Sequence, residues 1–344
     1  MGFDREAAIS WYRRNRARSQ ALFDLLTDDA YYSQPIALRH PIVFYAGHLP
    51  AFSFNTLARR GLGGDSIDER LETLFARGID PDTDTAPAAQ SLWPSRDEVA
   101  RFTDEADRRV LDALANADLD VAGHPLLDRA EAVYTVLEHE AMHQETLLYM
   151  WHRLPFDRKQ RPAGYMPMAT GRPPSTEWVS VPAGRATLGV DRGTVPFGWD
   201  NEFPSYRVEV PAFAIERHDV TNARFLEFVE AGGYVTEAWW TPADWKWVRE
   251  HLVHHPLFWE REGDRWYWRT MFERLPLPLS WPVYVSQAEA AAYARWKGAR
   301  LPSEAEYQRA AVGSPSSSSS SMGTINGGSL VMRGSPSTSW VSLE

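Results

Sequence analysis

The sequence contains no cysteine. This absence excludes a disulfide scaffold, a thiolate metal site and a cysteine nucleophile. Basic side chains are also in deficit, since 36 Lys and Arg face 46 Asp and Glu, which gives a net charge of −10. Such a chain lacks the excess of clustered Lys and Arg that binds phosphate backbones, so we expect no nucleic-acid partner.

Long apolar runs are absent as well. The first fifteen residues have no apolar core of signal-peptide length, and no later run approaches about 18 apolar residues, the length of a membrane span. We therefore expect no membrane partner and a cytoplasmic location. The composition that remains, 44% hydrophobic and 24% charged, is typical of a folded globular chain.

At 344 residues the chain exceeds the usual size of one hydrophobic core, so we expect two domains. Residues 1–155 are predicted to form an all-α four-helix bundle. Apolar residues at helical spacing predict its helices at 5–27, 42–57, 95–116 and 127–152, with a loop rich in Gly, Asp and Pro between the second and the third. Residues 156–176, rich in proline, are predicted to be a linker.

Residues 177–312 have the pattern of an α+β domain. Short strand-like and helical pieces alternate with turns, at Trp178–Val181, Tyr206–Val210, Asn222–Ala231 and Ser286–Trp296. Seven of the fifteen tryptophans lie between Trp239 and Trp268, which indicates a buried aromatic layer or the lining of a pocket. Residues 313–344, with a run of six serines, are too poor in apolar side chains to order themselves and are predicted to be a disordered tail.

Two histidines of the fourth predicted helix are spaced to share a metal ion. His139 and His143 stand four residues apart, so their imidazoles project from one helix face. Neutral imidazole suits Zn, Cu, Fe and Ni. The alternative is a pair of surface or core histidines that happen to share a face.

The same residues spell H-E-x-x-H, the motif of zinc proteases, in which Glu140 would be the general base. The extended form of that motif needs Gly where Thr146 stands and His where Tyr149 stands. The segment that follows is the proline-rich linker, which is a poor source of a glutamate ligand.

A third ligand could come from the second predicted helix. His48 lies there in an otherwise apolar stretch, and it is either a satisfied core residue or the completion of a three-histidine site inside the bundle. We expect His40, His124 and His152, near predicted ends or turns, to be structural or solvated. His254 and His255 are adjacent and would point apart in a helix or a strand.

Placed in their surroundings, these histidines resemble those of the ergothioneine-type sulfoxide synthases. The N-terminal part is similar to the DinB-like bundle of that family, and the C-terminal part to its sulfatase-modifying-factor domain, a C-type-lectin-like fold. The similarity lies in the segments 40–49, 138–148, 181–184, 200–204, 219–228 and 300–306. Together they extend roughly over residues 5–312.

The resemblance implies iron held by His48, His139 and His143. It also implies a reaction in which Fe(II) and O2 join a thiol, such as cysteine or γ-glutamylcysteine, to hercynine and oxidise the sulfur to a sulfoxide. Related formylglycine-generating enzymes use a pair of active-site cysteines, which this chain lacks. Arg96 is a candidate for a substrate carboxylate, although an arginine at a helix start is more often solvated.

The resemblance ends after Ala311. Members of the family continue through a segment rich in Gly, Asn and Trp, which supplies a tyrosine proposed as proton donor, and the tail of this chain does not match it. We therefore expect a C-terminally truncated or divergent member with an incomplete second domain. It should bind iron and turn over weakly or not at all. Alternatives are a selenoneine synthase of the same family, a DinB-type metal-dependent thiol transferase and a non-catalytic binding protein.

Overall fold

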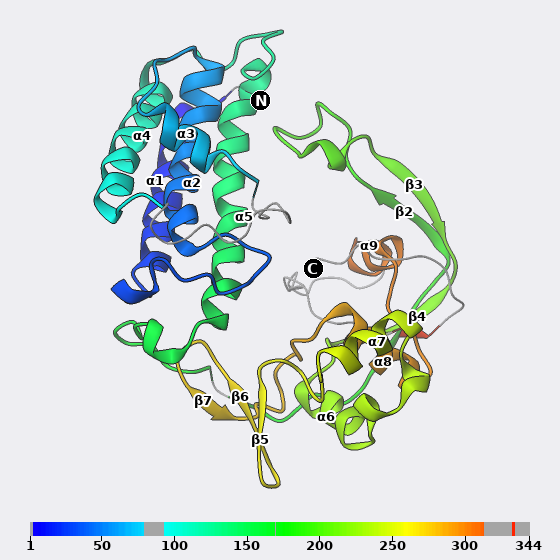
Figure 1. The fold of residues 1–344 in the computed structure, drawn as a ribbon. Coiled ribbons are helices and arrows are strands. Elements are labelled where there is room, and N and C mark those ends of the chain that lie inside the picture. Colours follow the sequence, from blue (N-terminus) through cyan, green and yellow to red (C-terminus); the bar gives the residue numbers. More distant parts are fainter. Residues whose placement is uncertain (1–2, 79–92, 169, 313–331, 334–344) are drawn as a thin grey trace. The chain divides into compact units, whose positions relative to one another are not determined.

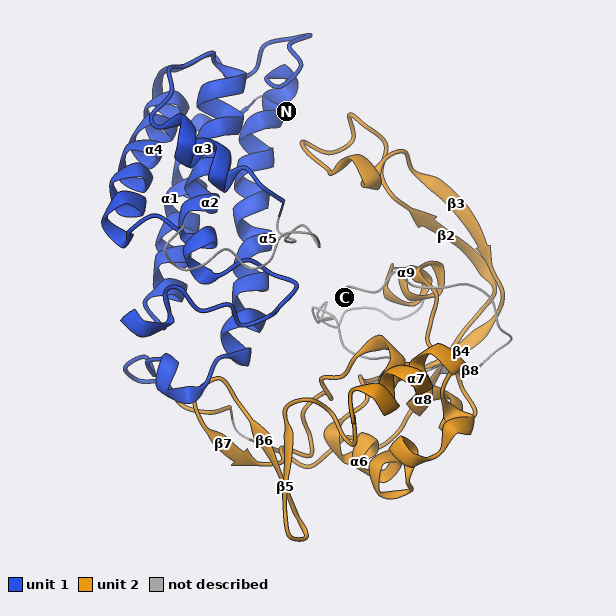
Figure 2. Cartoon of the chain, in the orientation of Figure 1, with its two compact units in different colours: residues 1–165 blue, residues 166–344 orange. Residues whose placement is uncertain are grey.

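The computed structural model describes residues 3–78, 93–168, 170–312 and 332–333. The chain divides into two units, Met1–Tyr165 and Met166–Glu344 (Figure 2). This division falls inside the segment 156–176, where the sequence predicts a linker. Among the described residues, no helix combines the length and apolar character needed to cross a membrane.

The first unit is a bundle of four long helices (Figure 1). They are α1 (Arg5–Phe23), α2 (Ile42–Ser53), α4 (Arg96–Asn116) and α5 (Glu131–Arg153), and the neighbouring pairs are α1–α5, α5–α2, α2–α4 and α4–α1. Short helical turns η1 (Asp28–Ala30), η4 (Asp128–Ala130) and η5 (Phe156–Arg158) border them. The predicted all-α bundle is confirmed.

Local sequence signals define the ends of these helices. The side chain of Asp4 accepts a hydrogen bond from the backbone of Ala7 and caps α1, and Ser95 with Glu98 forms a capping box at the start of α4. α5 begins four residues later than the predicted start, because Arg129 and Ala130 adopt positive φ angles of 58° and 55° that interrupt the helix.

α2 is the most deeply buried of the four long helices. Nearly all of its residues are buried, as expected for a helix that is apolar around its whole circumference. A π-helical segment, η2 (Phe54–Gly61), continues it four residues beyond the predicted end at residue 57. A histidine in α2 is therefore enclosed by apolar side chains.

A short helix, α3 (Glu69–Phe75), forms where the sequence predicts only a loop. The side chain of Asp68 caps it by accepting from the backbone of Leu71, and the buried Leu71 and Phe75 lie four residues apart on one face. α3 packs on α2 at Gly47, where an added Cβ would lie 2.2 Å from the Phe75 ring. The missing side chain of Gly47 thus determines how closely α3 approaches α2.

The second unit contains small antiparallel sheets and helices, which confirms the predicted α+β domain. The strands are β1 (Trp178–Val181), β2 (Gly184–Leu188), β3 (Tyr206–Val210), β4 (Phe213–Glu216), β5 (Trp259–Glu262), β6 (Arg265–Arg269), β7 (Arg274–Pro276) and β8 (Met332–Arg333). They form the sheets β1-β4-β8, β2-β3 and β5-β6-β7. In the first sheet Trp178 faces Glu216, and in the second Gly184 faces Val210.

The helices of the second unit are α6 (Asn222–Glu230), α7 (Pro242–Glu250), α8 (Gln287–Trp296) and α9 (Glu304–Val312), with short turns η6 (Asp200–Glu202), η7 (Gly233–Val235) and η8 (Glu237–Trp239). Its main core is aromatic. Trp240 and Trp259 are buried there, and the other five tryptophans between 239 and 268 pack against it. The tryptophan-rich segment therefore forms a buried aromatic layer, the first of the two predicted alternatives.

Within the predicted disordered tail, 313–344, the structure describes only residues 332 and 333. Met332 and Arg333 form β8 and pair with Ile215 and Ala214 of β4. Backbone hydrogen bonds make such a pairing and need no alternation of apolar side chains, so the sequence pattern gives no warning of it. The other tail residues lie outside the described part of the chain.

Gly47→Ala should lower the free energy of unfolding by about 1–3 kcal/mol, because the new methyl group overlaps the buried Phe75 ring. Urea denaturation followed by circular dichroism measures this change. Gly78→Ala is the control, since its Cβ would meet no atom within 4 Å. Equal stabilities of the two variants would contradict the packing described for α2 and α3.

Candidate metal centre

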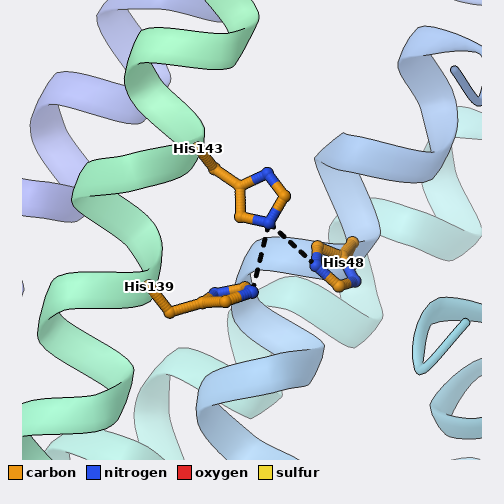
Figure 3. Close-up of side chains that lie close together, drawn as sticks. All are labelled: His48, His139 and His143. Atoms are coloured by element: carbon orange, nitrogen blue, oxygen red, sulfur yellow. Dashed lines mark hydrogen bonds between the residues drawn. The ribbon is translucent and has the colours of Figure 1, made fainter. Parts of the chain in front are cut away.

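α5 supplies two imidazoles on one face. His139 and His143 are four residues apart, both are buried, and their Nε2 atoms lie 3.1 Å from each other (Figure 3). The helical spacing inferred from the sequence therefore brings these two rings together. Each ring projects from α5 toward α2.

α2 supplies the third imidazole. The Nε2 atom of His48 lies 3.2 Å from Nε2 of His143, and the side chain is 5% exposed. One ring nitrogen from each of the three histidines lies within 4.8 Å of the other two. Figure 3 shows the three rings directed toward one point between the two helices.

A backbone carbonyl fixes the tautomer of His48. Its Nδ1 lies 2.7 Å from the carbonyl oxygen of Phe75 at the end of α3. Because a carbonyl only accepts, Nδ1 carries the proton and Nε2 keeps a free lone pair that faces the other two rings. The close approach of α3 at Gly47 thus has a chemical consequence, since it brings this carbonyl to His48.

Aromatic side chains hold the other two rings. Phe52 of α2 stacks on His139 with ring centroids 3.4 Å apart and an angle of 9° between the planes, and Tyr45 lies beside His143. The Nδ1 atoms of His139 and His143 are buried and have no hydrogen-bond partner among the described residues. On their Nδ1 side, packing and not a hydrogen bond therefore orients these two imidazoles.

Burial keeps all three imidazoles neutral. It lowers the pKa of His48, lowers that of His143 to about 3, and lowers that of His139 further, with the neighbouring histidines adding to the effect for the α5 pair. Neutral imidazole is the form that binds metal ions.

Protons alone cannot make good hydrogen bonds at both Nε2–Nε2 contacts of this cluster. Nε2 of His143 contacts the Nε2 atoms of both His48 and His139, and one proton there can point squarely at only one of them. A cation shared by the three lone pairs satisfies both contacts. A metal ion about 2.1 Å from two imidazole nitrogens at a right angle would separate them by about 3.0 Å, close to the two spacings of 3.1 and 3.2 Å around His143. The three residues therefore fit a metal ion.

Glu140 does not face the histidine cluster as a protease base would. Its Oε1 accepts hydrogen bonds from Arg16 Nη1 at 3.0 Å and Ser19 Oγ at 2.6 Å, both on α1. Since α1 lies on another side of α5, the carboxylate is held away from the point where the rings converge. The H-E-x-x-H spacing therefore does not produce the arrangement of a zinc protease here.

The other candidate residues lie elsewhere. His40 is bound to the carbonyl of Gly78, and His124 accepts from the backbone of Leu126 and Leu127, so both are structural as expected. Arg96 pairs with Asp28 and lies over the Tyr31 ring. It lines a cavity of about 580 Å³ at the α1–α4 seam, and none of the three clustered histidines lines that cavity.

Comparisons with known proteins cover both units. Residues 12–147 match the DinB superfamily, and residues 165–335 match the sulfatase-modifying factor enzyme 1-like domain. A hercynine oxygenase of Mycobacterium tuberculosis is 33% identical over 279 residues, which are 74% of this chain and 61% of that protein. This chain belongs to the two-domain ergothioneine-biosynthesis family.

Two further relatives in this family are similar. The hercynine oxygenase of Mycolicibacterium smegmatis is 38% identical over 186 residues, 52% of this chain and 41% of that protein. Ergothioneine biosynthesis protein 1 of Neurospora crassa is 27% identical over 81% of this chain and 35% of its own length. The chain thus spans less than two thirds of each of these relatives.

The comparisons also correct the predicted extent of the resemblance. The second-domain match continues to residue 335, whereas the sequence motifs indicate an end after Ala311. The serine-rich composition of this region contains none of the motifs on which the resemblance rests. A short strand such as β8 also has no side-chain pattern that would indicate it.

Three residues of the site are missed by sequence reasoning: Gly47, Phe52 and Phe75. Gly47 and Phe52 stand in the apolar segment around His48, and Phe75 lies in the segment predicted to be a loop. The i, i+4 spacing of His48 and Phe52 is the one signal that could have identified an orienting ring. Neither the role of Gly47 nor that of the Phe75 carbonyl has a signature in a single sequence.

Phe52→Leu should let the His139 ring move, because the stacked Phe52 ring holds it in place and its Nδ1 has no hydrogen-bond partner among the described residues. In NMR spectra of the metal-free chain, the ring protons of His139 should lose the upfield shift that the Phe52 ring causes. Phe23→Leu, which removes a ring that packs on Trp151, is the control and should leave these protons unchanged. An unshifted His139 in the wild-type chain would show that the rings do not stack.

Proposed function

We propose that this chain is a mononuclear non-heme Fe(II) protein that uses O2 to join a thiol to hercynine and to form a sulfoxide. His48, His139 and His143 are proposed as the iron ligands. The observation that carries the proposal is the convergence of three neutral Nε2 atoms in a bundle of this two-domain family.

The donor set by itself does not select iron. Three imidazoles also suit Zn, Cu and Ni, and a three-histidine zinc site with open positions is a common catalytic arrangement. Iron is proposed because the M. tuberculosis and M. smegmatis relatives are named hercynine oxygenases, and an oxygenase needs a centre that reacts with O2. When bound, Fe(II) would supply Lewis acidity and redox chemistry, with positions open to the thiol and O2.

The chain's own residues prepare the site. The Phe75 carbonyl holds the proton of His48 on Nδ1, so that Nε2 needs no change of tautomer before binding. Phe52 and Tyr45 keep the α5 rings in place and limit water around them. Because burial keeps the imidazoles neutral near pH 7, metal binding does not have to displace protons from histidinium.

Three neutral ligands would leave the charge of a divalent ion uncompensated. This favours an anionic thiolate as the next ligand and lowers the pKa of a substrate thiol. The absence of cysteine fits this proposal, since the sulfur comes from the substrate. None of the described side chains indicates which thiol is the substrate, or whether a selenium donor takes its place.

The full chain, purified without oxygen, should bind one Fe(II), and His143→Ala should weaken binding by at least about 100-fold because it removes a ligand and opens the site to water. Metal analysis with competitive titration measures this. His254→Ala, the loss of an exposed imidazole in the second unit, is the matched control and should bind as the wild type does.

The same protein, given hercynine, a thiol and O2, should form the sulfoxide slowly or not at all, and rapid turnover would contradict the expected impairment. Binding of a metal with thiol transfer but no O2 consumption would favour the thiol transferase. A chain that binds no metal would favour a non-catalytic binding protein and would contradict the proposal.

A further inference from the structure

We infer that the ion pair between Glu140 and Arg16 is a positioning device, which sets the rotation of α5 about its axis and so directs His139 and His143 toward His48. This inference rests on the proposed metal site. It is argued from the hydrogen bonds and the ion pair between α5 and α1, and among the described residues none of these involves an imidazole.

α5 carries two polar stripes side by side. One is the pair His139 and His143, and the other is Glu140 and Gln144, one residue further on and therefore about 100° around the helix. The first stripe faces α2 and the second faces α1. Because both stripes lie on the same short stretch of rigid helix, whatever holds the second also fixes the direction of the first.

The second stripe is bound to α1 by directional contacts. Glu140 is fully buried and accepts from Arg16 and Ser19 through Oε1. Nε2 of Gln144 donates to the backbone carbonyl of Asn15 at 2.9 Å and to Ser19 Oγ at 3.0 Å. Asn15 donates in turn to the carbonyl of Leu137, at 2.8 Å, so these contacts span the turn that carries the histidines.

The guanidinium of Arg16 is itself anchored. Its Nε lies 2.9 Å from a carboxylate oxygen of Asp107 on α4, and Tyr12 donates to Asp107 at 2.6 Å. Arg16 therefore links α5 to both α1 and α4. If α5 turned, Glu140 would leave a partner that cannot follow it.

The metal cluster is sensitive to such a turn. The Cα atoms of a helix lie about 2.3 Å from its axis and an imidazole Nε2 lies several ångströms further out, so a rotation of about 20° moves Nε2 by about 2 Å. The observed Nε2–Nε2 spacings are only 3.1 and 3.2 Å. Apolar packing between α5 and its neighbours is not directional, whereas a buried ion pair is.

The test uses Co(II) as the probe of the full chain, with the dissociation constant and the visible d–d absorption as readouts. Glu140→Leu should raise the dissociation constant about 10- to 100-fold and change the d–d spectrum, because α5 can then turn. Glu140→Gln keeps an oxygen acceptor for Arg16 and Ser19 and should give a smaller rise.

Trp151→Phe is the matched control. It removes a hydrogen bond between the same two helices, from Trp151 Nε1 to the carbonyl of Leu22, two turns beyond His143. It should lower the urea midpoint and leave the Co(II) readouts as they are in the wild type. A purely structural ion pair would behave in the same way as this control.

The double variant Arg16→Met with Glu140→Leu decides the question if Glu140→Leu does not fold, since it leaves no unpaired Arg16 charge beside α5. A folded variant without the ion pair that binds Co(II) with wild-type affinity and spectrum would overturn the inference. Failure of the wild-type chain to bind Co(II) is a different result, because it removes the metal site itself.

Discussion

Three imidazole nitrogens that approach to 3.1 and 3.2 Å inside a helical bundle impose the main constraint on this unit. Their rings are neutral and buried, and their facing lone pairs repel unless a proton or a cation lies between them. The position of α3 against α2, the tautomer of His48 and the stack of Phe52 on His139 all serve this convergence. The first two depend above all on the contact between Gly47 and the Phe75 ring, which leaves no room for a side chain at position 47.

α5 connects this cluster to the rest of the bundle. One of its faces carries imidazoles whose Nδ1 atoms meet no acceptor in the described part of the chain, and the adjacent face carries a carboxylate and an amide that are hydrogen-bonded to α1. Buried polar groups of the second kind are costly if they lose a partner. The same turn of helix therefore joins a site that needs a cation with a network that tolerates little displacement.

Much of this could be predicted from the sequence. Helical periodicity gave the four long helices, and the spacing of His139 and His143 placed both on one face. The bundle pattern offered His48 as a third ligand or as a core residue, and only the family resemblance chose between them, because the packing of α2 against α5 joins residues far apart in the chain. α3 and β8 were missed, since one depends on a single capping residue and the other on backbone pairing alone.

The roles of individual side chains around the site were harder to foresee. H-E-x-x-H is compatible with a protease base or with a structural carboxylate, and only the contacts of Glu140 with Arg16 and Ser19 distinguish the two. Likewise, an aromatic residue four positions after His48 is equally compatible with a core position. The rotation of each helix about its own axis decides the roles of Glu140 and Phe52. The periodicity of apolar residues does not fix that rotation closely enough to show which neighbour each side chain meets.

Anomalous X-ray diffraction at the iron absorption edge, from crystals grown with Fe(II) in the absence of oxygen, tests the central claim most directly. The account predicts one strong peak in the first unit, within bonding distance of the Nε2 atoms of His48, His139 and His143. A peak at other residues, a peak bound by only two of these histidines, or no peak in a protein saturated with Fe(II) would contradict it.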